Sequence, residues 1–292
     1  MTKKTFLSIA TALSATVVAC PPAVARDAPP AAEAAPTAET VLPDDVQWGP
    51  LNAARGDASP RAGNLWGDRT TPGASGFLVK FDEGFASPPH IHNVTYRGLV
   101  IEGLVHNDDP AAANMWLPAG SFWTQPAGES HITSAQGKAN LAYIEIQEGP
   151  YLVRPSDEAF DDGERPINVH ESNIVWLNAS DINWLKKSES EAAGKAPQMA
   201  FLWGNPKQDE MSGALLKLPP GFSGELHGSA SPLRAVVIKG EIGHRLTEDS
   251  EEKALPPGSY FGSDAAAVHE ITNMSDMDSI IYIRSKGPFT VD

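Results

Sequence analysis

Short apolar runs recur along the chain, and most have glycine, proline, asparagine or aspartate at one end or both. The clearest are residues 76–81, 99–105 and 141–146 in the first half and residues 214–218, 235–242 and 280–283 in the second. Their β-branched and aromatic residues favour strands, and the residues between them favour turns. No long stretch has the period of a helix. The pattern therefore predicts an all-β protein made of many short strands.

The second half of the chain repeats the first. Residues 64–68, Asn-Leu-Trp-Gly-Asp, return 137 positions later as Phe-Leu-Trp-Gly-Asn, and residues 99–103 return at the same offset. After one inserted residue, the block at 117–122 returns 138 positions later. A period this long indicates a duplicated domain, because solenoid repeats span about 20–50 residues. We expect one domain at residues 46–154 (copy one), a linker at 155–171 and a second domain at 172–292 (copy two).

The pattern of the first 45 residues predicts an export signal followed by a tether. Two lysines precede an apolar stretch at residues 6–19, which is too short to span a membrane and is typical of a secretory signal. Ala23-Val24-Ala25 resembles a cleavage site, so we expect a signal peptide at residues 1–25 and a periplasmic protein. Alternatively, residues 17–20 resemble a lipobox, and Cys20 would carry a lipid anchor. Residues 26–45 are rich in alanine, proline and glutamate, which predicts a disordered tether.

Charge and cysteine content exclude some classes of partner. The formal net charge is −15, from 37 acidic and 22 basic residues. Nucleic acids and anionic membrane surfaces favour basic patches, so neither is an expected partner. Cys20 is the only cysteine, so the folded part must be stabilised by its cores rather than by disulfides.

Three histidines in copy one form a candidate metal site. His90 and His92 alternate, so they share one face of a strand. Pro126 and Gly128 favour a tight turn just before His131, which can bring the third imidazole toward the other two. Three histidines with open positions are a known catalytic metal arrangement. Imidazole suits several transition metals, so the ligand set does not name the ion.

The spacing around these histidines resembles the two motifs of the cupin superfamily. Gly84, His90, His92 and Gly103 match the first motif, and Gly120, Pro126, Gly128 and His131 match the second. The chain departs from the motifs at Tyr96, where they have a glutamate ligand, and at Ala135, where they have asparagine. The resemblance covers about residues 45–292. It implies two tandem jelly-roll barrels (double-stranded β-helices) and a divalent transition metal (Fe, Zn, Ni, Cu or Mn).

Tyr96 is the candidate catalytic residue, and three roles are open for it. A phenol has an ordinary pKa near 10, so direct ligation would need a strongly acidic ion such as ferric iron. The hydroxyl can instead point at the metal's open position or at the substrate, which is the role we expect. A purely structural tyrosine is the third reading.

Copy two keeps only part of the site. Ser229 replaces His92 and Leu233 replaces Tyr96, while His227 and His269 remain. We therefore expect one metal per chain, in copy one. A site made of Glu225, His227 and His269 is the alternative that the sequence leaves open. His106, His170 and His244 have no spacing partner and are expected at the surface.

Two classes of function follow from the resemblance. Cupins with three-histidine sites include dioxygenases of diketones, thiols and flavonols, which implies an exported oxidoreductase acting on a small organic substrate. The alternative is a cupin that holds a metal or small ligand without catalysis, since one fold hosts many functions. Trp116, Phe122, Trp123 and Tyr143 are candidates for an apolar pocket wall around the ion, and the alternative for each is a place in the ordinary barrel core. A homodimer is allowed, but nothing in the sequence specifies it.

Overall fold

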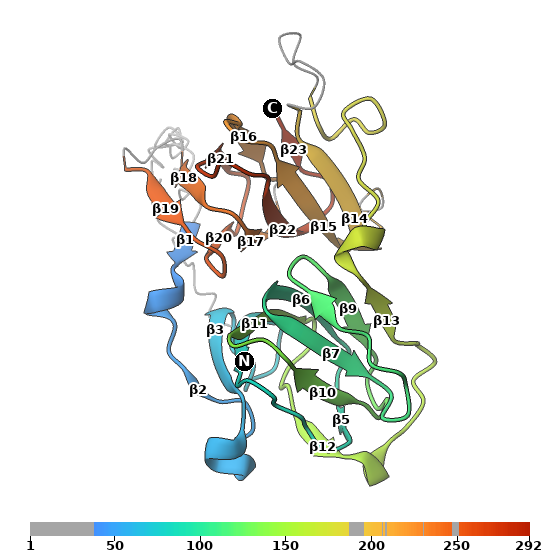
Figure 1. Ribbon diagram of the computed structural model, residues 1–292. Coiled ribbons are helices and arrows are strands. Elements are labelled where there is room, and N and C mark those ends of the chain that lie inside the picture. Colours follow the sequence, from blue (N-terminus) through green and yellow to red (C-terminus); the bar gives the residue numbers. More distant parts are fainter. Residues whose placement is uncertain (1–37, 187–195, 206, 208, 230, 247–250) are drawn as a thin grey trace, which may run out of the picture. The chain divides into compact units, whose positions relative to one another are not determined.

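The computed structural model describes residues 38–186, 196–205, 207, 209–229, 231–246 and 251–292 (Figure 1). Copy one contains β2 (Gly49–Pro50), β3 (Arg61–Trp66), β4 (Ser75–Phe81), β5 (His90–His92), β6 (Tyr96–Glu102), β7 (Leu104–Asp108), β8 (Leu117–Pro118), β9 (Phe122–Gln125), β10 (Ile132–Ala135), β11 (Asn140–Ile146) and β12 (Val153–Pro155). Copy two contains β14 (Gln198–Gly204), β15 (Met211–Leu218), β16 (Ser223–His227), β17 (Leu233–Lys239), β18 (Ile242–Leu246), β19 (Lys253–Leu255), β20 (Tyr260–Ser263), β21 (Val268–Asn273), β22 (Ser279–Lys286) and β23 (Thr290–Val291). Two further strands, β1 (Ala38–Val41) and β13 (Ile167–Val169), precede the two copies.

Helical structure among the described residues is confined to short 3-10 turns. These are η1 (Pro43–Asp45), η2 (Ala53–Ala58), η3 (Ser156–Glu158) and η4 (Glu171–Asn173). None of the helices in this part of the chain is long and apolar enough to cross a membrane.

Antiparallel sheets make up both copies. In copy one a seven-stranded sheet has the order β13-β9-β6-β11-β4-β3-β2, and smaller sheets have the orders β10-β7-β8 and β12-β5. In copy two the corresponding orders are β1-β20-β17-β22-β15-β14 and β19-β18-β21-β16-β23. The predicted all-β fold of two tandem jelly-roll domains is confirmed.

Each large sheet has one edge strand that comes from outside its own copy. β1, at the start of the described chain, pairs with β20 of copy two, and β13, between the copies, pairs with β9 of copy one. β9 and β20 are equivalent strands of the repeat. The prediction of a disordered tether is wrong for residues 38–45, and the linker at 155–171 supplies a strand to copy one. An edge strand needs main-chain bonds on one side only, so a composition without apolar alternation does not exclude it.

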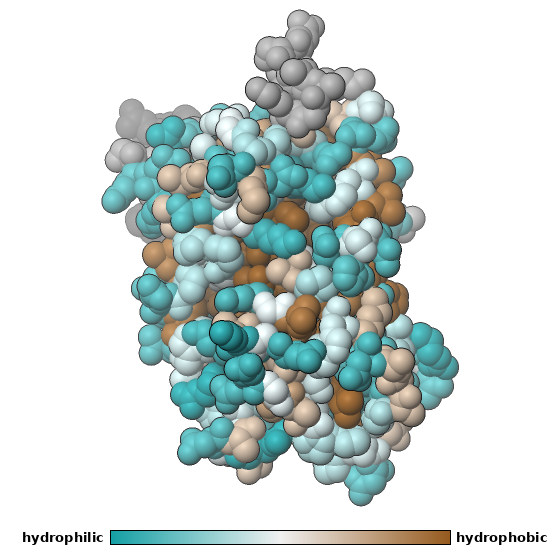
Figure 2. Space-filling view, viewed as in Figure 1, coloured by the Kyte–Doolittle hydropathy of each residue, from teal (hydrophilic) through white to brown (hydrophobic). Residues whose placement is uncertain are grey.

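The central strands of the large sheets are buried on both faces. In β4, Phe77 and Val79 point into copy one's own core, whereas Leu78 joins a cluster that includes Leu215 and Val236 of copy two. Side chains of a strand alternate between faces, so each apolar run supplies two cores at once. This explains why the runs in the sequence are continuous rather than alternating. On the face shown in Figure 2, hydrophilic side chains predominate and apolar ones lie in small groups.

A buried carboxylate joins the two copies. Glu145 accepts a hydrogen bond from Tyr143 at 3.1 Å and one from Tyr282 of copy two at 2.8 Å. The two tyrosine hydroxyls in turn accept bonds from the indoles of Trp66 and Trp203, at 3.0 and 2.9 Å. Glu145 is 1% exposed, and its equivalent in copy two carries the opposite charge.

That equivalent is Arg284, whose Nε lies 3.9 Å from the nearer Glu145 oxygen. Space for the paired rings comes from Gly76 and Gly213, where an added Cβ would lie 2.1 and 2.0 Å from the two indole nitrogens. No other residue type leaves that space open.

Replacing Glu145 with glutamine should lower the free energy of unfolding by about 3 kcal/mol, because it leaves the Arg284 charge buried without a carboxylate. Arg284→Met should cost a similar amount, and the double variant should cost clearly less than the sum of the two. Urea unfolding of the four proteins measures this coupling, and Glu102→Gln, an exposed change on β6, should cost less than about 0.5 kcal/mol. Strictly additive losses would show that the two side chains do not interact.

Candidate metal centre

The three predicted histidines come together at one end of copy one. His90 and His92 lie on β5, and His131 precedes β10 and forms an isolated bridge with His90. Two main-chain hydrogen bonds of 3.0 Å, one in each direction, hold His90 and His131 side by side. One ring nitrogen from each histidine lies within 4.8 Å of the others. His92 and His131 are buried and His90 is half-buried. The convergence expected from the motif spacing is therefore present in the structure.

Each imidazole is oriented by a main-chain carbonyl. The Nδ1 atoms of His90, His92 and His131 lie 3.0 Å from carbonyl oxygens, those of Pro88, Leu152 and Glu129 respectively. A carbonyl oxygen only accepts, so each Nδ1 carries the proton and donates it. In the neutral ring the other nitrogen, Nε2, then carries the lone pair that can bind a cation. The backbone bonds thus leave Nε2 of each histidine as the nitrogen that can bind a metal.

Burial keeps these rings neutral. Burial, with a smaller contribution from the neighbouring imidazoles, lowers the pKa of His131 to about 3 and that of His92 well below its usual value. The pKa of His90 is also lowered, mainly by burial and to a smaller extent by the positive charge of Arg55. A metal ion binds the unprotonated ring, so the site is ready for a cation at neutral pH.

Tyr96 lies beside the histidines within a polar network. Its hydroxyl donates to Asn107 Oδ1 at 2.9 Å and lies 3.3 Å from His131 Nε2. Asn107 also accepts from Thr133 and donates to Gln125, so its orientation is fixed. Burial raises the pKa of the Tyr96 phenol, which keeps it neutral. A neutral phenol beside the histidines agrees better with the expected role of Tyr96, a hydroxyl near the metal position, than with a phenolate that binds the metal directly.

A second tyrosine, which the motif spacing did not identify, reaches the same region. Tyr151 follows β11, and its hydroxyl lies 3.1 Å from His92 Nε2 while its ring stacks on the His92 ring at 4.2 Å between centroids. Desolvation raises the pKa of this phenol too. The signal was in the repeat: Gly149-Pro150-Tyr151 returns as Gly287-Pro288-Phe289, so copy two has lost this hydroxyl.

A cavity of about 490 Å³ opens onto His90 and His92. Trp123 lines it as predicted, together with Val79, Phe81, Phe85 and Ile144. The other aromatic candidates lie elsewhere. Phe122 and Tyr143 belong to the core between the copies, and Trp116 packs near His106, with ring centroids 5.9 Å apart. Volume and apolar lining are those of a small-molecule site.

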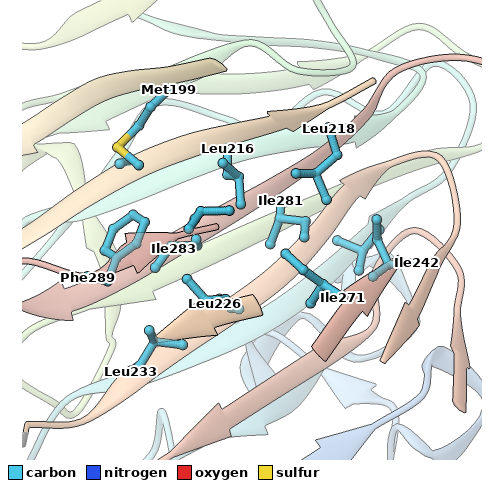
Figure 3. Packing of buried hydrophobic residues seen from close by; sticks show 14 of the residues in the cluster. Met199, Leu216, Leu218, Leu226, Leu233, Ile242, Ile271, Ile281, Ile283 and Phe289 are labelled. Atoms are coloured by element: carbon cyan, nitrogen blue, oxygen red, sulfur yellow. The ribbon is translucent and has the colours of Figure 1, made fainter. Parts of the chain in front are cut away.

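Copy two has an apolar filling in the corresponding place. Leu233, Ile271 and Phe289 stand where copy one has Tyr96, Thr133 and Tyr151, and they pack with aliphatic neighbours (Figure 3).

The prediction that His106 and His244 are exposed is wrong, because both are buried. His244 occupies the position of Asn107 and hydrogen-bonds His269 at 3.0 Å, an arrangement that no local spacing reveals.

The alternative site in copy two does not form as proposed. His269 lies buried between His244 and Ser263, away from Glu225. Instead, Glu225 and His227 group with Asp292 at the surface. There, His227 Nε2 contacts Asp292 at 2.6 Å and Glu225 at 3.2 Å, which is the geometry of a histidine that donates to carboxylates. These contacts need no metal.

The buried histidine pair of copy two should make the metal-free protein sensitive to acid. The pKa of His244 is lowered to about 3 by burial and by His269. Between about pH 6.5 and 3 the unfolded chain binds a proton that the folded chain does not, so stability is complete above pH 6.5 and falls as the pH falls. From pH 7 to 5, His244→Gln should lose about 2 kcal/mol less than wild type. Urea unfolding at both pH values measures this, and His170→Gln should follow wild type. Equal losses in His244→Gln and wild type would contradict the assignment.

Comparisons with known proteins agree with this fold. The model of a family described as a domain of unknown function (DUF4437) matches residues 39–292. Among solved structures, a protein from Nostoc punctiforme provisionally described as a dioxygenase has a TM-score of 0.60 at 16% identity, covering 87% of this chain and 82% of that one. Protein Ylba from E. coli has a TM-score of 0.56 at 13% identity, covering 85% and 90%.

A third similar structure is the oxalate decarboxylase of Lactobacillus farciminis in its formate complex. Its TM-score is 0.51 at 13% identity, and the alignment covers 87% of both chains. No curated protein sequence matches the chain significantly. Identities this low show a shared fold and leave the chemistry to be argued from the site.

Proposed function

The chain belongs to the DUF4437 family and has the cupin fold, and we propose that it is a metal-dependent oxidoreductase of the dioxygenase type. Its substrate would be a small organic molecule that fits the cavity of copy one. The observation that supports this most is the set of three Nε2 lone pairs, each fixed by an Nδ1–H bond to a carbonyl.

The donor set fits one divalent transition metal. Three neutral imidazoles leave the +2 charge of such an ion without compensation, since Tyr96 replaces the usual carboxylate and is itself neutral. The ion, when bound, would supply Lewis-acid activation of an oxygen-bearing substrate. Imidazole binds several transition metals well, so the three histidines fit more than one of them.

The residues around the histidines have separable roles in this proposal. Tyr151 keeps its proton and can donate a hydrogen bond to an oxygen bound at the site, whereas the Tyr96 proton is donated to Asn107, so the Tyr96 oxygen can accept a hydrogen bond from a bound group. Asn107 holds the Tyr96 hydroxyl in place from the far side. Trp123 and Phe81 line the cavity, and a substrate packed against them would leave less room for water, which would strengthen the electrostatic interactions inside.

Export to the periplasm is part of the proposal. It is supported by the signal-like pattern of residues 1–25, which lies outside the described residues together with Cys20. The proposed partner is a small-molecule substrate, and we do not propose binding to nucleic acid.

Turnover by metal-loaded protein tests the proposed function. Protein reconstituted with ferrous iron should consume oxygen with at least one member of a panel of diketones, catechols and thiols. His92→Ala should lose the metal and the oxygen uptake while its circular dichroism stays β-type, because the cores rather than the site support the fold. His227→Ala, which changes the copy-two equivalent of His90, should retain both.

Two results would overturn parts of this proposal. Stoichiometric metal without turnover across the panel, but with tight binding of a panel member, would favour a cupin that holds its ligand without catalysis. An unfolded His92→Ala protein would show that the metal is structural.

Tyr96 should adjust the site rather than build it. Tyr96→Phe removes one hydroxyl and keeps the ring, so metal affinity should change little and any activity should fall by about 10–100-fold. Tyr96→Glu restores a carboxylate that offsets part of the ion's charge, so it should tighten metal binding and weaken anionic ligands. Metal titration of both variants measures this, with Tyr260→Phe as a buried tyrosine control in copy two. Loss of metal binding in Tyr96→Phe would make tyrosine a direct ligand.

A further inference from the structure

The wall of the copy-one cavity is electrostatically unlike the rest of the chain. Acidic residues outnumber basic ones by 37 to 22 in the sequence. Among the described residues that line this cavity there is no aspartate or glutamate, whereas two arginines, Arg55 and Arg154, do line it. A cavity with positive charge and no carboxylate favours an anionic occupant, because nothing in its wall repels one.

Arg55 is the cation that is free to bind such an occupant. It lies in η2, and its guanidinium carbon is 6.0 Å from the ring centroid of Phe85, another wall residue. Within the described part of the chain it forms no ion pair, whereas Arg154 lies 3.5 Å from Glu158. A guanidinium presents a planar fork of donors that matches a carboxylate.

The loop that carries Arg55 is held in place by its own hydrogen bonds. The Asn52 side chain accepts from Ala54 N at 3.0 Å and caps the turn. Asn52 N donates to Ser59 Oγ at 2.8 Å, which closes the loop at its base. Arg55 is therefore presented by a defined turn rather than by a free segment.

The cavity is lined by both polar and apolar side chains. His90, His92, Tyr96 and Tyr151 line it together with Arg55 of η2, and Val79, Phe81 and Ile144 supply apolar parts of its wall. A ligand that matches both the Arg55 charge and the apolar wall has an anionic group and an apolar body. A neutral ligand would leave the Arg55 charge unmatched.

We propose that the substrate class of this cavity is a small organic carboxylate with an apolar body, whose carboxylate is bound by Arg55. The inference rests on the proposed function for its relevance to catalysis, but the binding that it describes does not require the metal. Arg55 is accordingly a specificity-determining residue, which selects acids over their neutral analogues.

Binding of matched acids and amides to metal-free protein tests the inference. Phenylacetate and phenylacetamide differ mainly in charge, and calorimetry or ligand-observed NMR of chelator-treated full chain gives both affinities. Wild type should bind the acid at least about 10-fold more tightly, which corresponds to about 1.4 kcal/mol. Arg55→Gln should bring the ratio close to one, and Arg55→Lys should retain part of it.

Arg61→Gln is the matched control, because Arg61 lies on β3 near η2 and does not line the cavity. It should keep the wild-type ratio. Equal affinity for acid and amide in wild type, or an unchanged ratio in Arg55→Gln, would overturn the inference. Acid selectivity that depends on Arg55 in a protein that binds no metal would support the inference and contradict the proposed oxidoreductase function. The two proposals can therefore fail separately.

Discussion

The two large sheets bury their outer faces against the same core, and the rest of the molecule depends on this shared packing. Leu78 of copy one and Leu215 of copy two lie in one apolar cluster, and Glu145 accepts hydrogen bonds from one tyrosine of each copy. The exchange of edge strands adds main-chain bonds that connect β1 to copy two and β13 to copy one. Copy one would expose this cluster and leave Glu145 half-satisfied if copy two were absent. The duplicated domain is thus required for structure even where its chemistry has gone.

Because this packing uses the outer faces of the large sheets, the interiors of the two barrels can differ. Copy two has exchanged its site tyrosines for Leu233 and Phe289 and fills its barrel with aliphatic side chains. Copy one keeps three histidines, two phenols and a cavity of about 490 Å³. Burying polar groups is costly unless they are hydrogen-bonded, and here the carbonyls of Pro88, Leu152 and Glu129 meet that cost while orienting the rings. The same bonds that satisfy the histidines prepare them for a cation.

The sequence predicted the features that repeat at fixed spacing and missed those set by distant contacts. Strand alternation and the turn before His131 were enough to bring three histidines together, and the repeat showed which copy had lost them. The strand at Ala38–Val41 was missed because an edge strand carries no apolar alternation of its own. The burial of His244 depends on His269, 25 residues away, and Tyr151 reaches His92 across 59 residues. The repeat marked Tyr151 as a residue that differs between the copies, but its contact with His92 and the pairing of His244 with His269 follow only from the folded arrangement of the strands.

The most direct test of this account is the number and place of the metals in the folded chain. Crystals grown with a transition metal and measured at that metal's absorption edge would show each ion as an anomalous peak. The account predicts one peak per chain, within bonding distance of Nε2 of His90, His92 and His131. A peak at the group formed by Glu225, His227 and Asp292, or an empty three-histidine site in the presence of excess metal, would contradict it.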